Sequence, residues 1–438
     1  MSREAQICLV SPGHLGSNPR LVKEADALIE AGYRVHVISG DTHPGSRSRD
    51  ADILEKAGWT SEIVKLRPSR LVYARRRLKQ KICRSLFASG ARTLQIAERA
   101  HHPLVLPLIA AASDFAADFY IGHCLAALPA VVAAGSKHKA RIGFDAEDFH
   151  SGEAEKGSRG ELDNAIAEYL EAGLLRQCHL RTASSPLIAE AYRSRHAVNF
   201  IPLLNVFPLD EAVEPERLPP TPSLYWFSQT IGPGRGLEEF ISILSLMNGA
   251  VRLDLRGHST ESFRRQLQAR ASGAPIELRF LEPDVPRAMV RDAAGYTAGL
   301  GLELRHPLNR DLCLSNKAFT YLLAGVPVIL SRTKAQERLA LELGRACLVI
   351  DLEDREGAAR AMGEWLVNSA AQQKARVKAF QLGRERFNWD REKRIFLEQV
   401  EKVLSRHLPL PRAGTPGREL TAVLMPEKHP EPAGSIRR

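Results

Sequence analysis

Metal-binding and disulfide-forming cysteine patterns are absent from this sequence of 438 residues. The six cysteines lie far apart, with no CxxC motif and no Cys/His pair at ligand spacing, at Cys8, Cys83, Cys124, Cys178, Cys313 and Cys347. Such spacing argues against a zinc ribbon and against a disulfide framework. We therefore expect reduced thiols in a cytoplasmic protein, with no metal site and no bound cofactor.

Long hydrophobic runs are also missing. No apolar stretch approaches the roughly 20 residues that cross a bilayer. The first residues, MSREAQICLVSPG, lack the apolar segment of a signal peptide and read as a first strand. With 44% hydrophobic and 26% charged residues the composition is that of a globular protein, and its length predicts two domains.

Acidic residues are missing from one segment, residues 65–92, which carries ten lysines and arginines. Because the net charge of the whole chain is +10, the rest of the chain is formally neutral. Apolar residues are interleaved with these cations, which is typical of a helix on an anionic membrane surface. The central cations are Arg75, Arg76, Arg77, Lys79, Lys81 and Arg84. A solvated helix face over a core stripe is an equally good interpretation, whereas nucleic acid is not expected because no binding motif accompanies the segment.

Strand-length apolar runs alternate with helical patterns along most of the chain. Residues 5–11, 19–32 and 33–39 read as strand, helix and strand, which predicts a parallel sheet covered by helices on both faces. Further strand-like runs cover residues 119–123, 140–146, 179–185, 198–203, 224–229, 251–257, 276–282, 298–304 and 326–330. The fold class is therefore α/β, with two doubly wound, Rossmann-like domains.

A proline-rich break, FPLDEAVEPERLPPTPS, separates the two alternating regions. We place the domain linker at 207–223, between a first domain over 1–206 and a second domain over 224–390. We expect a closing helix over 391–407 that returns to the first domain, and a disordered tail over 408–438. Two such domains form a cleft, and ligands of parallel sheets bind beyond the carboxyl ends of the strands.

Two loops at predicted strand ends carry suitable chemistry. In LCLSNKAFTYLLAGVPVILSR, from Leu312, a loop enters a helix through Ser315, Asn316 and Lys317. Free backbone N–H groups and a cation then meet at one point, which suits an anion. The other loop, SPGHLGSNPR, is a glycine-rich turn that lacks the GxGxxG pattern, so a dinucleotide is not expected and an ordinary tight turn remains an alternative.

Four segments, in this order, resemble the family-four retaining glycosyltransferases of the GT-B fold. They cover residues 12–39, 117–153, 225–240 and 299–331, and residues 387–404 resemble the closing helices of that family. The resemblance implies two domains facing each other across a cleft, with the donor nucleotide on the second and the acceptor on the first. It implies transfer of a sugar from a nucleotide-sugar donor to a glycan or lipid-linked acceptor, with retention at the anomeric carbon.

The resemblance also implies roles for individual residues. His123 would lie under the donor sugar, Glu303 would be the first acidic position of the family's motif, and Arg235 and Lys317 would stabilise the leaving diphosphate in place of a metal ion. A structural histidine and an exposed loop glutamate are the alternatives for His123 and Glu303. The expected donor-binding residues are Gly13, His14, Gly16, Ser315, Asn316, Thr320 and Gln229, with a helix cap as the alternative for Asn316.

Several positions depart from the family pattern. Thr320 stands where a ribose-binding glutamate is usual, Gln229 where a basic ligand is common, and Glu147 and Asp148 where the family often has His-Glu. These departures leave two alternatives to a transferase. One is a catalytically degenerate scaffold that binds nucleotide sugars or glycans, and the other is a nucleotide-sugar epimerase of the same fold.

Overall fold

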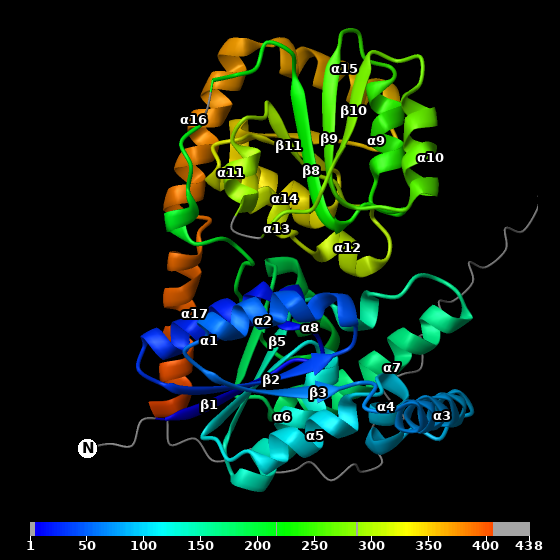
Figure 1. The fold of residues 1–438 in the computed structure, drawn as a ribbon, viewed down its shortest axis with the longest axis vertical. Coiled ribbons are helices and arrows are strands. Elements are labelled where there is room, and N and C mark those ends of the chain that lie inside the picture. The colour runs from blue at the N-terminus through cyan, green and yellow to red at the C-terminus, as the bar shows by residue number, and fades with distance from the viewer. Residues whose placement is uncertain (1–4, 216, 286–287, 406–438) are drawn as a thin grey trace, which may run out of the picture.

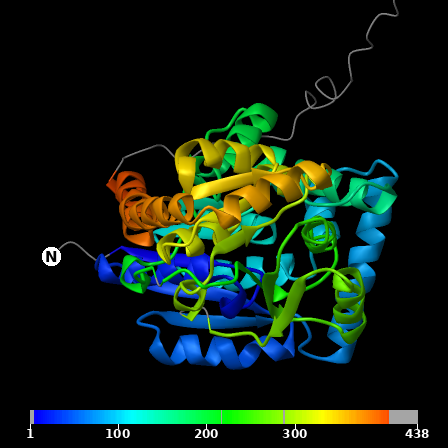
Figure 2. The ribbon, with the colours of Figure 1, turned by 90° about the horizontal axis from the view of Figure 1, so that it is seen from above.

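The computed structural model describes residues 5–215, 217–285 and 288–405, and it consists of two parallel β-sheets, each enclosed by helices (Figure 1). Viewed from above, the second domain lies over the first, and helices of the first domain extend beyond its outline (Figure 2). This confirms the predicted α/β class with two doubly wound domains. Within the described ranges, no helix is both long and apolar enough to cross a membrane.

The first sheet has seven strands in the order β3-β2-β1-β4-β5-β6-β7. Their bounds are β1 Gln6–Val10, β2 Arg34–Asp41, β3 Thr60–Lys65, β4 Phe119–His123, β5 Arg141–Ala146, β6 Leu180–Ala183 and β7 Ile201–Pro202. The helices of this domain are α1 Pro19–Glu30, α2 Arg47–Lys56, α3 Arg70–Ala88, α4 Leu94–His101, α5 Val105–Asp114, α6 Leu128–His138, α7 Ser158–Leu174 and α8 Pro186–His196. Residues 7–10 of β1 are fully buried, because helices cover both faces of the sheet.

The second sheet has six strands in the order β10-β9-β8-β11-β12-β13. Their bounds are β8 Ser223–Thr230, β9 Val251–His258, β10 Ile276–Leu281, β11 Ala298–Gly301, β12 Val328–Ser331 and β13 Cys347–Ile350. The helices that follow β8 are α9 Leu237–Leu244, α10 Glu261–Ala271, α11 Met289–Ala293, α12 Leu308–Leu312, α13 Asn316–Leu323, α14 Lys334–Leu343, α15 Arg355–Val367, α16 Ser369–Glu385 and α17 Trp389–Ser405.

The chain passes between the domains twice, and the two crossings are hydrogen-bonded to each other. The first sheet ends at Pro202 and the second begins at Ser223. The connection between the sheets therefore begins before the predicted linker, which starts at residue 207. At the second crossing the backbone N–H of Trp389 donates to the carbonyl of Phe207 at 2.7 Å. Helix α17 then lies beside the first domain (Figure 1). Its residues Phe396, Val400 and Val403 pack into the core of that domain. Residues 406 and 407 of the predicted closing helix, and the predicted tail, lie outside the described residues.

The strand order determines where a ligand can bind. In each sheet the direction of winding reverses once, between β1 and β4 in the first domain and between β8 and β11 in the second. The loops on the two sides of such a reversal separate and leave a crevice beyond the carboxyl ends of the strands. The site residues discussed below come from these loops and from the helices that follow them.

Candidate active site

A cavity of about 430 Å³ lies between the two domains. Its first-domain wall is formed by Arg20, Glu147, Asp148, Glu153, Ser184 and Asn205. Its second-domain wall is formed by Arg235, Glu303, Pro307, Asn309, Arg310, Cys313, Leu314, Ser315, Asn316 and Lys317. Among these described residues the first wall has three carboxylates and one cation, and the second wall has three cations and one carboxylate.

Arg235 reaches the second wall from the loop between β8 and α9. Gly234 and Gly236 on either side of it adopt φ values of 70° and 74°, in the left-handed region that favours glycine. A Cβ on Gly236 would lie 3.0 Å from a side-chain carbon of Leu352, so space is limited there too. Arg310, on α12, donates a hydrogen bond to the carbonyl of Gly234 and thereby fixes this loop. The sequence-predicted cation therefore lies at the cavity, and Arg310 is a cation that the sequence did not reveal.

Lys317 occupies the first turn of α13 and is buried, with 7% of its surface exposed. Its Nζ lies 3.9 Å from Oε1 of Glu303 and 5.5 Å from the centroid of the Trp226 ring. Burial lowers the pKa of Lys317; the Glu303 carboxylate opposes this shift, and Arg235 adds to it. Glu303 is itself buried, and its backbone N–H donates to the Ser331 hydroxyl at 2.8 Å, so it is not an exposed loop residue. The structure thus brings three of the four predicted catalytic residues together.

Ser315 precedes α13 with extended backbone, at the N-cap position, and Asn316 is the first residue of the helix. The alternative reading of Asn316 as the helix cap is therefore wrong. The Ser315 hydroxyl does not cap the helix, and its buried oxygen has no hydrogen-bond partner within the part of the chain that the structure describes. Since both residues line the cavity, an anion there would meet the first N–H groups of a helix, with the Ser315 hydroxyl beside them.

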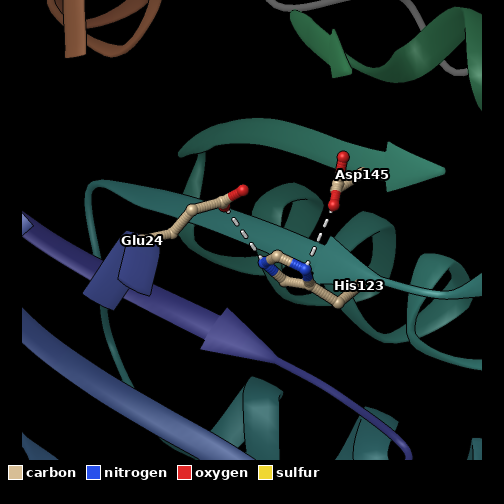
Figure 3. A group of neighbouring side chains, drawn as sticks. All are labelled: Glu24, His123 and Asp145. Atoms are coloured by element: carbon tan, nitrogen blue, oxygen red, sulfur yellow. Dashed lines mark ion pairs between the residues drawn. The ribbon is translucent and has the colours of Figure 1, made fainter. Parts of the chain in front are cut away.

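Behind the first wall lies a buried cluster of charges (Figure 3). Nε2 of His123 lies 3.3 Å from Oε2 of Glu24, and Nδ1 lies 3.3 Å from Oδ2 of Asp145 and 3.4 Å from Oε1 of Glu147. Burial alone would lower the pKa of His123, but these carboxylates raise it well above its ordinary value. The ring therefore has a carboxylate near each nitrogen, which favours its protonated form.

Arg20 completes this cluster from α1. Its Nε and Nη2 donate to the two carboxylate oxygens of Asp145 at 2.5 and 2.8 Å, and its Nη1 donates to the Leu203 carbonyl. The Thr182 hydroxyl donates to the same carboxylate at 2.6 Å. Although burial opposes the shift, Arg20 and His123 together lower the pKa of Asp145. Both oxygens of this carboxylate accept hydrogen bonds within the protein.

Glu24, His123 and Asp145 also come close enough to hold a metal ion, with ligand atoms within 4.8 Å of one another. These three side chains suit a proton on His123 better than a metal ion, however. Both oxygens of Asp145 already accept hydrogen bonds from Arg20, whose positive charge would repel a metal ion at this point. We interpret the cluster as an imidazolium held between carboxylates.

The predicted contact between His123 and the donor sugar needs correction. His123 has no exposed surface and does not line the cavity, so its ring cannot touch a ligand in this arrangement. It lies directly behind Glu147, which does line the cavity and whose Oε1 also accepts a hydrogen bond from Asn18 Nδ2 at 2.6 Å. The position of His123 at the end of β4 was predicted correctly, but its reach was not.

The glycine-rich loop after β1 is also placed differently from the prediction. Nδ1 of His14 lies 2.5 Å from Oδ2 of Asp50, and its Nε2 accepts the backbone N–H groups of Thr42 and His43. The N–H of Gly16 donates to Oδ1 of Asp50 at 2.9 Å, so the loop is tied to α2. Gly13, His14 and Gly16 do not line the cavity, because these contacts hold the loop against its own domain.

Thr320 and Gln229 likewise do not line the cavity. Thr320 is fully buried one turn inside α13, where its hydroxyl donates to the Asn316 carbonyl at 3.0 Å. Gln229 is exposed near the end of β8. Two of the positions where the sequence departs from the glycosyltransferase pattern therefore make no contribution to the cavity wall, whereas the other two, Glu147 and Asp148, line it.

Asn309 links the two walls. Its Nδ2 donates to Oδ1 of Asp148 at 2.6 Å, and its Oδ1 accepts the backbone N–H of Phe149 at 2.8 Å. Burial and the neighbouring Glu153 raise the pKa of Asp148 to about 6, although His150 opposes the shift. Neither Asn309 nor Asp148 was a predicted site residue, because a contact between domains has no signature in one sequence.

Solved structures share this two-domain architecture. One is the complex of HepE from Anabaena with UDP-glucose, whose sequence is 14% identical and whose TM-score is 0.66. The superposition covers 91% of this chain and all of the HepE chain. Sucrose-phosphate synthase from Thermosynechococcus elongatus is 13% identical with a TM-score of 0.66, over 92% of this chain and 99% of that one. A TarM variant from S. aureus, solved with UDP among its ligands, is 8% identical with a TM-score of 0.64, over 92% of this chain and all of that one.

No protein-family profile matches this chain, and no curated protein sequence does. At identities this low, the solved structures establish the fold alone. The chain has the GT-B fold, with two parallel-sheet domains that enclose a charged cavity.

Proposed function

We propose that this protein is a glycosyltransferase that moves a sugar from a nucleotide-sugar donor to an acceptor hydroxyl, with retention at the anomeric carbon. The observation that carries the proposal is the second wall of the cavity. Arg235, Arg310 and Lys317 converge there with the unpartnered Ser315 hydroxyl and the N-terminus of α13. A departing nucleoside diphosphate gains negative charge, and preorganised cations and N–H groups lower the barrier for that step.

The choice of donor class is supported by the fold. The HepE structure, which shares the GT-B architecture, was solved with UDP-glucose. A donor of this class carries the diphosphate that the second wall suits. The sugar would then face the first wall, where Glu147 and Asp148 offer carboxylates to hydroxyl groups.

The proposed reaction takes place on one face of the sugar. The bond between the anomeric carbon and the diphosphate oxygen breaks, and the acceptor oxygen forms its bond to that carbon from the same side. The acceptor proton passes to the departing phosphate oxygen. Arg235 and Lys317 stabilise the charge of the leaving group, and Glu303 holds Lys317 in place. No carboxylate of the protein forms a covalent intermediate, unlike the nucleophile of a retaining glycosidase.

In this proposal His123 is a positioning residue. The imidazolium attracts Glu147 from behind, at 3.4 Å, and Asn18 fixes the same carboxylate oxygen. Glu147 is thereby held toward the cavity, where it can accept a hydrogen bond from a substrate hydroxyl. This assignment replaces direct contact between His123 and the sugar.

The test is nucleotide release from a panel of nucleotide sugars, measured with and without glycan or lipid-linked acceptors. Wild-type protein is compared with Arg235→Ala and with the control Arg265→Ala, whose arginine is exposed on α10. We expect turnover in the wild type and the control and a loss of about 100-fold or more in Arg235→Ala. The anomeric configuration of the product, read by NMR, tests retention. Equal turnover in all three proteins would remove Arg235 from its role.

The same assay separates the two alternative functions. A degenerate scaffold would be stabilised against heat by a nucleotide sugar but would release no nucleotide. An epimerase would convert the donor without any acceptor. We further propose that the acceptor belongs to polysaccharide or glycolipid synthesis and that the protein works at the inner face of the membrane, as a peripheral protein.

A further inference from the structure

Helix α3 carries an apolar stripe that faces away from the protein. Leu71, Leu78, Ile82 and Leu86 are 73%, 59%, 51% and 43% exposed. Their spacing of seven, four and four residues places all four on one side of a helix. Other strongly exposed apolar residues, such as Leu341 and Val377, stand singly on separate helices. A row of four on one helix is therefore a feature of its own.

The opposite side of α3 attaches it firmly to the first domain. Cys83 and Phe87 are buried in the core of that domain. Nε2 of Gln80 donates to the carbonyls of Ala100 and His101 in α4, and Arg84 forms an ion pair of 2.5 Å with Asp163 of α7. Because the other side of α3 already packs on the first domain, the apolar stripe is not the side that joins the helix to its own domain.

The cations of α3 divide into two groups. Arg76, Arg77 and Arg84 donate hydrogen bonds within the protein, to the Lys65 and Leu66 carbonyls, to Gln80 and to Asp163. The other three, Arg75, Lys79 and Lys81, are exposed. By helical geometry Arg75 lies within the apolar stripe, and Lys79 and Lys81 lie on either side of it. Half of the cations singled out in the sequence are therefore available to a partner.

We propose that this face of α3, with its four apolar residues and with Arg75, Lys79 and Lys81, docks the protein on an anionic lipid bilayer. An apolar stripe flanked by lysine and arginine matches the depth profile of a bilayer surface, where acyl chains lie below charged headgroups. Charge complementarity favours anionic lipid, since residues 65–92 contain no acid. Helix α3 also lies at the outer edge of the first domain, away from the second (Figure 1).

The inference deepens the proposed function, because a lipid-linked acceptor would be met at such a surface. Its test does not depend on sugar transfer. The full-length protein is sedimented with phosphatidylcholine vesicles, with and without phosphatidylglycerol, at low and high salt. We expect binding to the mixed vesicles that is at least tenfold stronger than to phosphatidylcholine alone and that weakens as salt rises.

Two variants and one control separate the contributions to binding. Leu78→Glu with Ile82→Glu removes the apolar stripe, and Arg75→Gln with Lys79→Gln and Lys81→Gln removes the exposed cations. Each should weaken binding to the mixed vesicles at least tenfold. The control Leu341→Glu replaces a more exposed leucine on α14 and should bind like the wild type. Thermal unfolding checks that every variant is folded.

Nucleotide release with a water-soluble acceptor, measured on the same proteins, keeps the two proposals apart. Retained turnover with lost vesicle binding supports the docking surface. Wild-type binding by the Leu78→Glu/Ile82→Glu variant, or binding of the wild type to neither vesicle, would overturn the docking proposal and leave the transfer proposal intact. Vesicle binding without any turnover in the wild type would overturn the transfer proposal and leave the docking proposal intact.

Discussion

The two walls of the cavity use charge in different ways. On the first wall, Glu147 is balanced from behind by His123, which is in turn held by Glu24 and Asp145. On the second wall, Lys317 and Arg235 face the cavity with Glu303 as the carboxylate closest to the lysine. One set of charges satisfies itself within the protein, whereas the other is left for a ligand to satisfy.

This difference has a physical basis. A buried charge is tolerated only when a partner replaces the water that it has lost. The first-domain cluster meets that condition for Asp145, which accepts hydrogen bonds from Arg20 and Thr182, so it can serve as a rigid support. Glu24 is only paired with His123, and burial raises the pKa of Glu24. The second-domain cations do not meet it fully, since burial and Arg235 both lower the pKa of Lys317. An anion would complete that site.

The largest expected change in stability tests the buried cluster of Arg20, His123 and Asp145. Asp145→Asn removes the carboxylate that Arg20, His123 and Thr182 share. Because it leaves two buried cations short of a partner, we expect a loss of about 3–5 kcal/mol in the free energy of unfolding, measured by urea denaturation.

The matched control for that experiment is Glu168→Gln, which breaks the surface ion pair with Arg195 of 2.8 Å. An exposed pair of this kind contributes about 0–1 kcal/mol, so the control should unfold almost like the wild type. Similar losses in the two variants would show that the buried cluster is no more important to stability than a surface pair.

The second prediction tests the cations that face the cavity. Lys317→Met should lower kcat by about 10²–10³-fold, because it removes a donor aimed at the leaving group. Its thermal stability should stay the same or rise, since a desolvated ammonium near Arg235 is replaced by an apolar chain. The control Lys334→Met, at an exposed lysine paired with Asp311, should keep its turnover. If Lys317→Met instead lowered thermal stability together with turnover, Lys317 would be a structural lysine.

The sequence predicted the fold because its signals are local. Strand-length apolar runs separated by helical periods predict an α/β fold with a parallel sheet, and β1 and α1 illustrate this. Boundaries were less certain in the linker, where the first sheet ends at Pro202 and proline-rich sequence continues to Ser223.

The site was only partly predictable, because its contacts join distant segments. Arg235, Glu303 and Lys317 lie at strand ends or helix starts, which sequence patterns can locate. Arg20 and Asp145 are 125 positions apart, and no local pattern announces their contact. One signal was present, however. Arg20 and Glu24 are opposite charges four residues apart among buried apolar residues of α1, which is unusual for a solvated pair.

A third prediction compares two hydroxyl groups in the same stretch of chain. Ser315→Ala removes an unpartnered oxygen at the cavity and should weaken donor binding about threefold to tenfold, the value of one hydrogen bond. Thr320→Val removes a hydroxyl that bonds within α13, and should change the KM for the donor less than about twofold. The reverse order would place the Thr320 hydroxyl, rather than that of Ser315, at the donor.

A fourth prediction concerns Lys23, which lies where the two domains are joined. Its half-buried side chain donates to Oδ1 of Asn205 and to the Val206 carbonyl, and its Nζ lies 5.8 and 5.2 Å from the centroids of the Phe207 and Trp389 rings. Burial and the charge of Arg20 lower the pKa of Lys23 to about 7.

Between that value and the ordinary pKa of 10.5, the unfolded chain binds a proton that the folded chain has released. The free energy of unfolding should therefore rise with pH across this window, and Lys23→Met should show a flatter profile. Urea denaturation of both proteins at several pH values across the window measures the difference. Parallel profiles would mean that Lys23 stays charged in the folded protein, stabilised by Asn205, the Val206 carbonyl and the two rings.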